Sequence, residues 1–250
     1  MARQPIITVA SPKGGEGKTT LAYELASLFD AVLVDFDWEM GGATGMVGDD
    51  PERRSKSAML ACLEKGEGPT PRPLHVAGRP AVVPSDSRLA ELRTGSSVVS
   101  GCLEDWAEAW QTPVVVDTHP GTGALADGAM VAADVIAVPI VLGAREMEAL
   151  GGFLRRVADA DLPLVIVPNR WRALKAELPF LQLLAKWSKD TGIMVAPPVQ
   201  DHPWLSRRQR RAALSLVESP GVEVKRAAAQ FKDVAMALVE HMKEVRDDND

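Results

Sequence analysis

Ser11-Pro-Lys-Gly-Gly-Glu-Gly-Lys-Thr-Thr20 is the stretch that decides the fold of this chain. It follows a β-branched apolar run at 6–10 and precedes a run at 19–29 with apolar residues at helical spacing. Glycines between a strand and a helix let backbone N–H groups approach phosphates closely, as in the phosphate-loop pattern G-x-x-x-x-G-K-[ST]. Gly17, Lys18 and Thr19 end that pattern here. We therefore expect Lys18 to hold β- and γ-phosphate oxygens and the Thr19 hydroxyl to complete a Mg²⁺ shell.

Short β-branched runs alternate with helical patterns along the rest of the chain. Most of the runs are continuously apolar, which is typical of strands covered on both faces. The pattern predicts an α/β fold, a doubly wound, mostly parallel sheet flanked by helices, with its ligand beyond the carboxyl ends of the strands. Strands are expected at 6–10, 31–34, 81–83, 113–116, 135–140, 162–167 and 193–196, and helices at 19–29, 97–110, 145–158, 176–189 and 224–245. We interpret 1–250 as a single domain with a surface loop at 66–73 and a frayed acidic tail at 247–250.

The composition is that of an ordinary globular protein. Hydrophobic residues make up 46% and charged residues 25% of the chain, and no apolar run reaches the ~20 residues that a bilayer requires. No secretory h-region follows the first residues, and Cys62 and Cys102 are too few for a disulfide framework, so we expect a cytoplasmic protein. The formal net charge of −6 argues against nucleic-acid binding by the whole surface, but allows a local basic patch.

A second lysine, Lys13, gives the loop the form K-G-G-x-G-K-T-T. This octet resembles the deviant Walker A motif of the ParA/MinD group of P-loop ATPases. The resemblance implies an ATPase that uses ATP and Mg²⁺ and forms an ATP-dependent homodimer, in which Lys13 reaches the partner's nucleotide as a catalytic residue in trans. The nucleotide-binding residues implied for the loop are Lys13, Gly14, Gly15, Glu16, Gly17, Lys18, Thr19 and Thr20, with Lys18 also catalytic.

Two acidic stretches follow strands of the predicted sheet. Asp35 and Asp37 stand at the end of the second strand and point the same way, because strand side chains alternate. By resemblance they belong to switch I, where Asp35 supports the metal shell and Asp37 positions or activates the attacking water. Residues 113–117 resemble a Walker B strand with Asp117 bound to Mg²⁺ through water, and 118–121 would be switch II. Four apolar residues before an acid also occur wherever a buried strand surfaces, so the Walker B interpretation depends on its place after the phosphate loop.

The switch loops depart from the family pattern. Many partition ATPases read D-x-D-P-Q-G-N-A-T, whereas this chain reads Asp35-Phe-Asp-Trp-Glu-Met-Gly-Gly-Ala-Thr44. Trp38 and Glu39 replace Pro-Gln, and His119 stands where an apolar residue or proline is common. The four histidines, at 75, 119, 202 and 241, match no metal-ligand spacing in the sequence.

A base-recognition segment is expected at 165–170, where a strand ends in Pro-Asn-Arg. Asn169 resembles the family asparagine that reads the base through its amide, and the alternative is a turn-capping role. The guanine pattern N-K-x-D is absent, which favours ATP over GTP. The remaining residues predicted around the base are Arg170, Pro198, Gln200 and Asp201.

A basic cluster lies near the end of the chain. It is predicted to bind nonspecific DNA through phosphates, and the alternative is a solvated helix face. Partition ATPases bind DNA with basic residues in this part of the chain, which implies a nucleoid-associated protein whose ATP hydrolysis is stimulated by a ParB-type centromere-binding partner. No helix-turn-helix segment precedes the phosphate loop, so operator binding is not expected. The predicted DNA-binding residues are Arg207, Arg208, Arg210, Arg211, Lys225 and Arg226.

The sequence most resembles small ParA-type partition ATPases, and three other functions compete with that interpretation. In a MinD-like ATPase the last helix would bind membrane; here it ends in acidic residues, so we expect Phe231, Val234, Leu238 and Met242 to pack against the domain and no membrane partner. A reductase like the nitrogenase iron protein needs cysteines beyond Asp117, and none is present. A scaffold that binds ATP and barely hydrolyses it remains an alternative.

Overall fold

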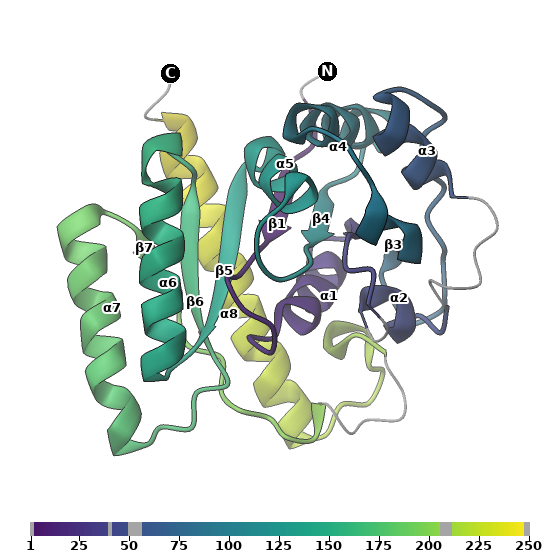
Figure 1. The fold of residues 1–250 in the computed structure, drawn as a ribbon. Helices are drawn as coiled ribbons and strands as arrows, with labels where there is room; N and C mark the ends of the chain where they lie inside the picture. The colour runs from purple at the N-terminus through teal and green to yellow at the C-terminus, as the bar shows by residue number, and fades with distance from the viewer. Residues whose placement is uncertain (1–2, 40–41, 50–56, 206–211, 248–250) are drawn as a thin grey trace.

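The computed structural model describes residues 3–39, 42–49, 57–205 and 212–247. Its centre is a seven-stranded sheet of order β3-β2-β4-β1-β5-β6-β7, in which every paired strand is parallel to its neighbour. The predicted doubly wound parallel α/β fold is therefore confirmed (Figure 1). The strands are β1 (Ile6–Val9), β2 (Val32–Asp35), β3 (Ala81–Val83), β4 (Val114–Asp117), β5 (Val135–Val141), β6 (Leu164–Asn169) and β7 (Met194–Val195).

Helices cover both faces of the sheet. In β5, Val135 and Ala137 pack into the cluster under α1 (Lys18–Leu28) and α8 (Val222–Asp247), whereas Ile136 and Val138 pack under α6 (Ala144–Val157). Both faces of the strand are buried, which explains why the apolar run is continuous rather than alternating. The main helices are α1 (Lys18–Leu28), α3 (Ala58–Lys65), α4 (Ser96–Trp110), α5 (Ala124–Ala132), α6 (Ala144–Val157), α7 (Leu178–Thr191) and α8 (Val222–Asp247), with a short α2 (Ala43–Met46) after β2.

The last helix packs against the protein, as predicted. Phe231, Val234 and Leu238 are buried in the same cluster as α1, and Met242 packs against its edge. Helix α8 ends at Asp247, the first residue of the predicted tail at 247–250, and residues 248–250 lie outside the described part. Within the described chain, we find no helix with the length and apolarity to cross a bilayer.

Three helices, the short α2 and helices α3 and α5, were not predicted from the sequence. Helix α5 consists mainly of small residues and lacks the wide apolar stripe that marks an amphipathic helix. A Cβ at its Gly128 would come within 2.5 Å of both the Ser96 carbonyl oxygen and the Val99 side chain. The small residues of α5 therefore serve close packing against α4, which a search for apolar periodicity does not detect.

The strand order places the chemically important loops together. Because β1 lies between β4 and β5, the loops that follow these strands share the carboxyl edge of the sheet with those after β2 and β6. The register pairs Asp117 with Val9 on one side and with Asp35 on the other. This edge brings the predicted phosphate loop and the predicted carboxylates to one place.

Candidate nucleotide-binding site

The phosphate loop connects β1 to α1 through glycines in left-handed conformations. Gly15 has φ +84°, and Gly17, the N-cap residue of α1, has φ +89°. A side chain at Gly17 is also excluded by space, because its Cβ would lie 2.3 Å from Nδ2 of Asn169. The loop thus requires glycine at position 17 for both conformation and contact.

The loop is held in shape from outside. Nδ2 of Asn169 donates a hydrogen bond of 2.7 Å to the carbonyl oxygen of Glu16, and the Glu16 carboxylate accepts one from the Val141 N–H. Burial raises the pKa of Glu16, while that backbone donor opposes the rise. Ser11 donates to the Lys13 carbonyl oxygen at 2.8 Å. The loop that would receive a phosphate chain is therefore fixed by β5 and β6.

Lys18 is the buried cation of the site. Its side chain lies under the loop, with Nζ 3.4 Å from the Lys13 carbonyl oxygen, and the residue is only 5% exposed. Burial lowers its pKa, whereas the charges of Asp117 and Asp37 raise it. An ammonium group placed between a glycine loop and two carboxylates suits the binding of phosphate oxygens.

Asp117 offers the free carboxylate of the site. It is fully buried, and among the described residues no hydrogen-bond donor satisfies either of its oxygens. Burial and the neighbouring Asp35 raise its pKa well above the ordinary value, while Thr19 and Lys18 act in the opposite direction. A buried, unpartnered carboxylate beside a threonine hydroxyl fits a Mg²⁺ ion, which prefers hard oxygen ligands.

Both carboxylate oxygens of Asp35 accept hydrogen bonds from the loop that follows β2. Its Oδ2 accepts hydrogen bonds of 2.6 Å from both the N–H and the hydroxyl of Thr44, and its Oδ1 accepts one of 3.0 Å from the Asp37 N–H. Burial raises its pKa to about 6, against the effect of these donors. In this structure Asp35 organises the loop after β2, and Asp117 is the carboxylate with unused oxygens.

Asp37 stands further out at the same edge. It is half-buried, and burial raises its pKa, while the Glu39 N–H and the positive charge of Lys18 lower it. Its Oδ1 accepts a hydrogen bond of 3.2 Å from the Glu39 N–H. The structure thus brings Asp37 close enough to Lys18 for their charges to interact, and its water-positioning role stays a prediction.

Lys13 does not face the buried carboxylates. Its Nζ donates to the Arg145 carbonyl oxygen at 3.1 Å and lies 3.6 Å from Oε1 of Glu146, in the first turn of α6. Its side chain is 39% exposed. Within one chain the second lysine is therefore directed across the surface, away from the position of Lys18.

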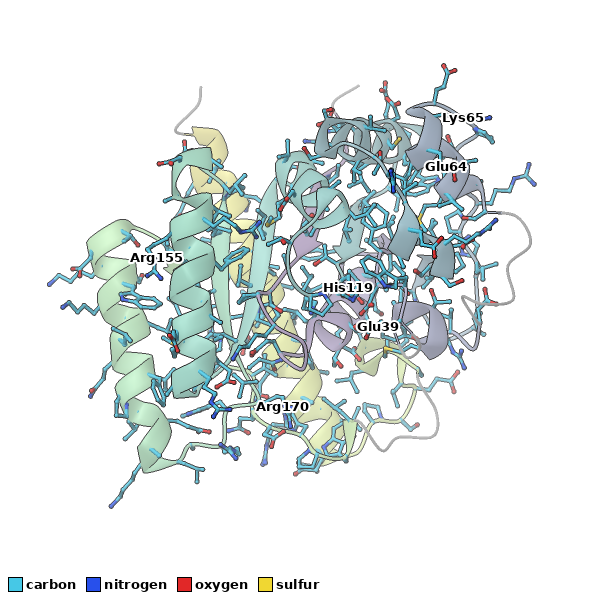
Figure 2. All side chains as sticks on the ribbon, in the orientation of Figure 1. Glu39, Glu64, Lys65, His119, Arg155 and Arg170 are labelled. Atoms are coloured by element: carbon cyan, nitrogen blue, oxygen red, sulfur yellow. The ribbon has the colours of Figure 1, made fainter. Side chains whose placement is uncertain are left out.

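The predicted base segments lie side by side. The loop after β6 pairs with residues 199–201, since the Trp171 N–H donates to Val199 and the Asp201 N–H to Trp171. Nε of Arg170 lies 3.6 Å from Oδ1 of Asp201, and Figure 2 shows Arg170 at the lower end of the sheet. Gln200 belongs to the same pairing, and Pro198 precedes it. The amide of Asn169 is occupied by Glu16 and by the Arg170 N–H, so here it supports the phosphate loop.

The basic cluster is only partly described. Arg207, Arg208, Arg210 and Arg211 lie outside the described residues. Lys225 and Arg226 are exposed on the first turns of α8, where Arg226 lies 3.5 Å from Glu223.

Comparisons with known proteins agree with this geometry. Residues 4–162 match the family AAA_31, described as an AAA domain. The chromosome partitioning protein ParA of Caulobacter vibrioides is 29% identical over 167 residues, which span 61% of this chain and 61% of that protein's length.

Two solved structures share the fold at low sequence identity. A complex of a McdA point variant from Cyanothece with ATP has a TM-score of 0.76 at 18% identity, covering 95% of this chain and 97% of that one. A putative plasmid partition protein from Borrelia burgdorferi bound to AMPPNP has a TM-score of 0.74 at 17% identity, covering 96% and 99%. With the Lys13–Lys18 phosphate loop and the parallel sheet, the family match shows that the chain belongs to AAA_31, within the ParA/MinD group of P-loop ATPases.

Proposed function

We propose that this protein is a partition-type ATPase that binds nonspecific DNA as an ATP-dependent dimer and releases it on hydrolysis. The observation that carries the proposal is the pair formed by the buried Lys18 and the unpartnered, buried Asp117 at the mouth of a loop with a second, outward-directed lysine. The named partition proteins among its relatives support the same class of function.

The placement of the residues supports the following roles. The glycine loop and Lys18 hold the phosphates, and Thr19 and Asp117 would hold Mg²⁺. When bound, that ion neutralises charge on phosphate oxygens. Asp37 orients the attacking water, and Arg170 with Asp201 borders the base.

Dimerisation and DNA binding complete the proposal. Lys13 leaves Glu146 and reaches the nucleotide of a second copy, where a cation assists phosphoryl transfer as an arginine finger does. The arginines at 207–211, with Lys225 and Arg226, hold DNA on the nucleoid, and a ParB-type partner stimulates hydrolysis. DNA affinity should fall with salt, by ~0.9 log units per neutralised phosphate for each log unit of salt.

A DNA-retention assay tests the proposal. The protein is measured without nucleotide and with ADP, ATP or a nonhydrolysable ATP analogue, while its mass in solution is followed in parallel. We expect retention and dimers with ATP and the analogue only. Equal retention with ADP would contradict the switch.

A charge-matched variant pair locates the DNA surface. Alanine at Arg207, Arg208, Arg210 and Arg211 should abolish retention and leave ATP binding intact. The control removes four exposed cations elsewhere, Lys65, Arg72, Arg93 and Lys189, and should retain DNA. Equal losses of DNA retention in both variants would mean that net charge alone causes the effect.

Two further measurements distinguish the competing functions. ATP-dependent sedimentation with anionic liposomes would favour the MinD-like function. If no single-turnover hydrolysis occurs with DNA and the partner present, the scaffold function would be favoured.

A further inference from the structure

The two departures from the family pattern meet in space. Trp38, in the loop after β2, stacks on His119, in the loop after β4, with ring centroids 3.9 Å apart and an interplanar angle of 8°. Trp38 also packs against the core cluster beneath β2 and β4. The imidazole plane is therefore fixed by a ring that is itself anchored in the core.

Two carboxylates lie beside the imidazole of His119, so that three potential metal ligands meet there. Asp37, Glu39 and His119 each offer one ligand atom, and these atoms all lie within 4.8 Å of one another. Figure 2 shows Glu39 and His119 close together at the centre of the molecule's face. They come from loops 80 residues apart in the sequence, which is why their spacing along the chain does not resemble a metal motif.

The distance between the His119 nitrogen and the Glu39 oxygen suits two ligands of one metal ion better than a direct hydrogen bond. Nε2 of His119 lies 3.5 Å from Oε1 of Glu39. A charge-assisted N–H···O bond is about 2.7–2.9 Å long. Two ligands on one tetrahedral ion with bonds of about 2.0–2.2 Å are roughly 3.4 Å apart. The observed distance is thus the one expected across an edge of such a coordination shell.

We propose that Asp37, Glu39 and His119 bind a divalent transition-metal ion of the Zn²⁺ class, which links the loop after β2 to the loop after β4. One imidazole and two carboxylates are a ligand set that zinc accepts, whereas Mg²⁺ prefers six oxygen ligands in octahedral geometry. The side chain of Glu39 is 70% exposed and that of His119 is 25% exposed, so an ion can enter from solvent. A water would complete a tetrahedral shell.

This site does not use Thr19 or Asp117, but it shares Asp37 with the proposed position of the attacking water. It also does not depend on ATP hydrolysis or DNA binding, so it can be tested on the nucleotide-free protein. A failure of the metal site would leave the proposed ATPase function standing, and the reverse also holds.

Calorimetric titration with Zn²⁺ tests the proposal on the chelator-treated 250-residue protein in excess Mg²⁺ without nucleotide. The variants are His119→Asn, which removes the imidazole, and Glu39→Gln, which removes an exposed charge. The matched controls, His75→Asn and Glu64→Gln, change exposed residues of the same types outside the cluster (Glu64 in Figure 2). Co²⁺ replaces Zn²⁺ in a parallel titration, because its visible absorption reports tetrahedral coordination directly.

We expect the wild type and both controls to bind a single Zn²⁺ ion alike. Each site variant should bind at least about tenfold more weakly, and His119→Asn should lose the tetrahedral Co²⁺ absorption. Circular dichroism verifies that the variants are folded. If His119→Asn does not fold, the Zn²⁺ affinity of Glu39→Gln tests the proposal. Wild-type affinity in a folded site variant, or equal weakening in the controls, overturns the proposal.

Discussion

Asp117 and Asp35 form a pair of buried carboxylates at the ends of β4 and β2, and their strands are adjacent in the sheet. Burial raises both pKa values, for Asp35 to about 6. Between the ordinary carboxyl pKa of 3.8 and that value, the folded protein binds more protons than the unfolded chain. The contribution of Asp35 to the free energy of unfolding therefore decreases as the pH rises from 3.8 to about 6. Above that pH it does not change further.

Asp117→Asn should stabilise the protein in the absence of metal and nucleotide. At pH 8 the substitution removes a buried charge beside Asp35, and we expect the free energy of unfolding to increase by about 1–3 kcal/mol. At pH 5, where the folded carboxyls hold more of their protons, the gain should be smaller. Thermal or denaturant unfolding at the two pH values measures this difference.

The same variant should lose the stabilisation that Mg²⁺ and ATP give the wild type, because asparagine is neutral and keeps only one of the two side-chain oxygens. Asp105→Asn, on the exposed face of α4, is the control and should change neither quantity. A destabilised Asp117→Asn protein at pH 8 would show that the carboxylate already has a stabilising partner.

The phosphate loop is the element whose shape depends most on a single position. Gly17→Ala would introduce a Cβ 2.3 Å from Asn169 Nδ2 at a φ of +89°, so either the loop or the Asn169–Glu16 hydrogen bond must give way. We expect ATP binding to be lost and stability to fall by roughly 1–3 kcal/mol. Fluorescent-nucleotide titration and thermal unfolding measure the two effects.

Gly101→Ala is the matched control for that substitution. Gly101 lies within α4 and a Cβ there meets nothing within 4 Å, so alanine should stabilise the helix by up to about 1 kcal/mol and leave ATP binding unchanged. If Gly17→Ala bound ATP as the wild type does, the loop would tolerate a rearrangement that this structure excludes.

Substitutions in α8 distinguish a helix that packs in the folded core from a helix that binds membrane. Leu238 is fully buried, so Leu238→Ala should reduce the free energy of unfolding by about 2–5 kcal/mol. Met236, on the same helix, is 60% exposed, and its replacement by alanine should change stability by less than about 0.5 kcal/mol. Denaturant unfolding compares them, and similar small effects in both variants would mean that α8 is not part of the folded core in solution.

At the scale of the whole molecule, the positions of Lys13 and Lys18 predict that replacing each lysine affects nucleotide binding and dimer formation differently. Lys18 faces the buried carboxylates, whereas Lys13 is directed to the surface at the start of α6. Lys18→Ala should lose nucleotide binding. Lys13→Ala should keep ATP binding by the monomer and lose the ATP-dependent dimer, because its ammonium acts on the partner's nucleotide.

Light scattering after size exclusion, with a nonhydrolysable ATP analogue, measures that outcome. Lys65→Ala, on α3 and far from the loop in Figure 2, is the control and should dimerise normally. A Lys13→Ala protein that dimerised like the wild type would remove the basis for a cation acting in trans.

The sequence alone determined the parallel α/β fold, the phosphate loop and the positions of the acidic residues. These are local properties: continuous apolar runs specify buried strands, and the loop motif lies within ten consecutive residues. It missed α2, α3 and α5, and the small residues of α5 carry no amphipathic pattern.

Only the tertiary structure decided which side chains share a site. The unused oxygens of Asp117, the Asn169 amide beneath the phosphate loop and the cluster of Asp37, Glu39 and His119 all depend on strand order and register. Those contacts join residues that are far apart in the chain. No short stretch of sequence encodes which strands become neighbours, so the geometry of the site follows only from how the strands pack.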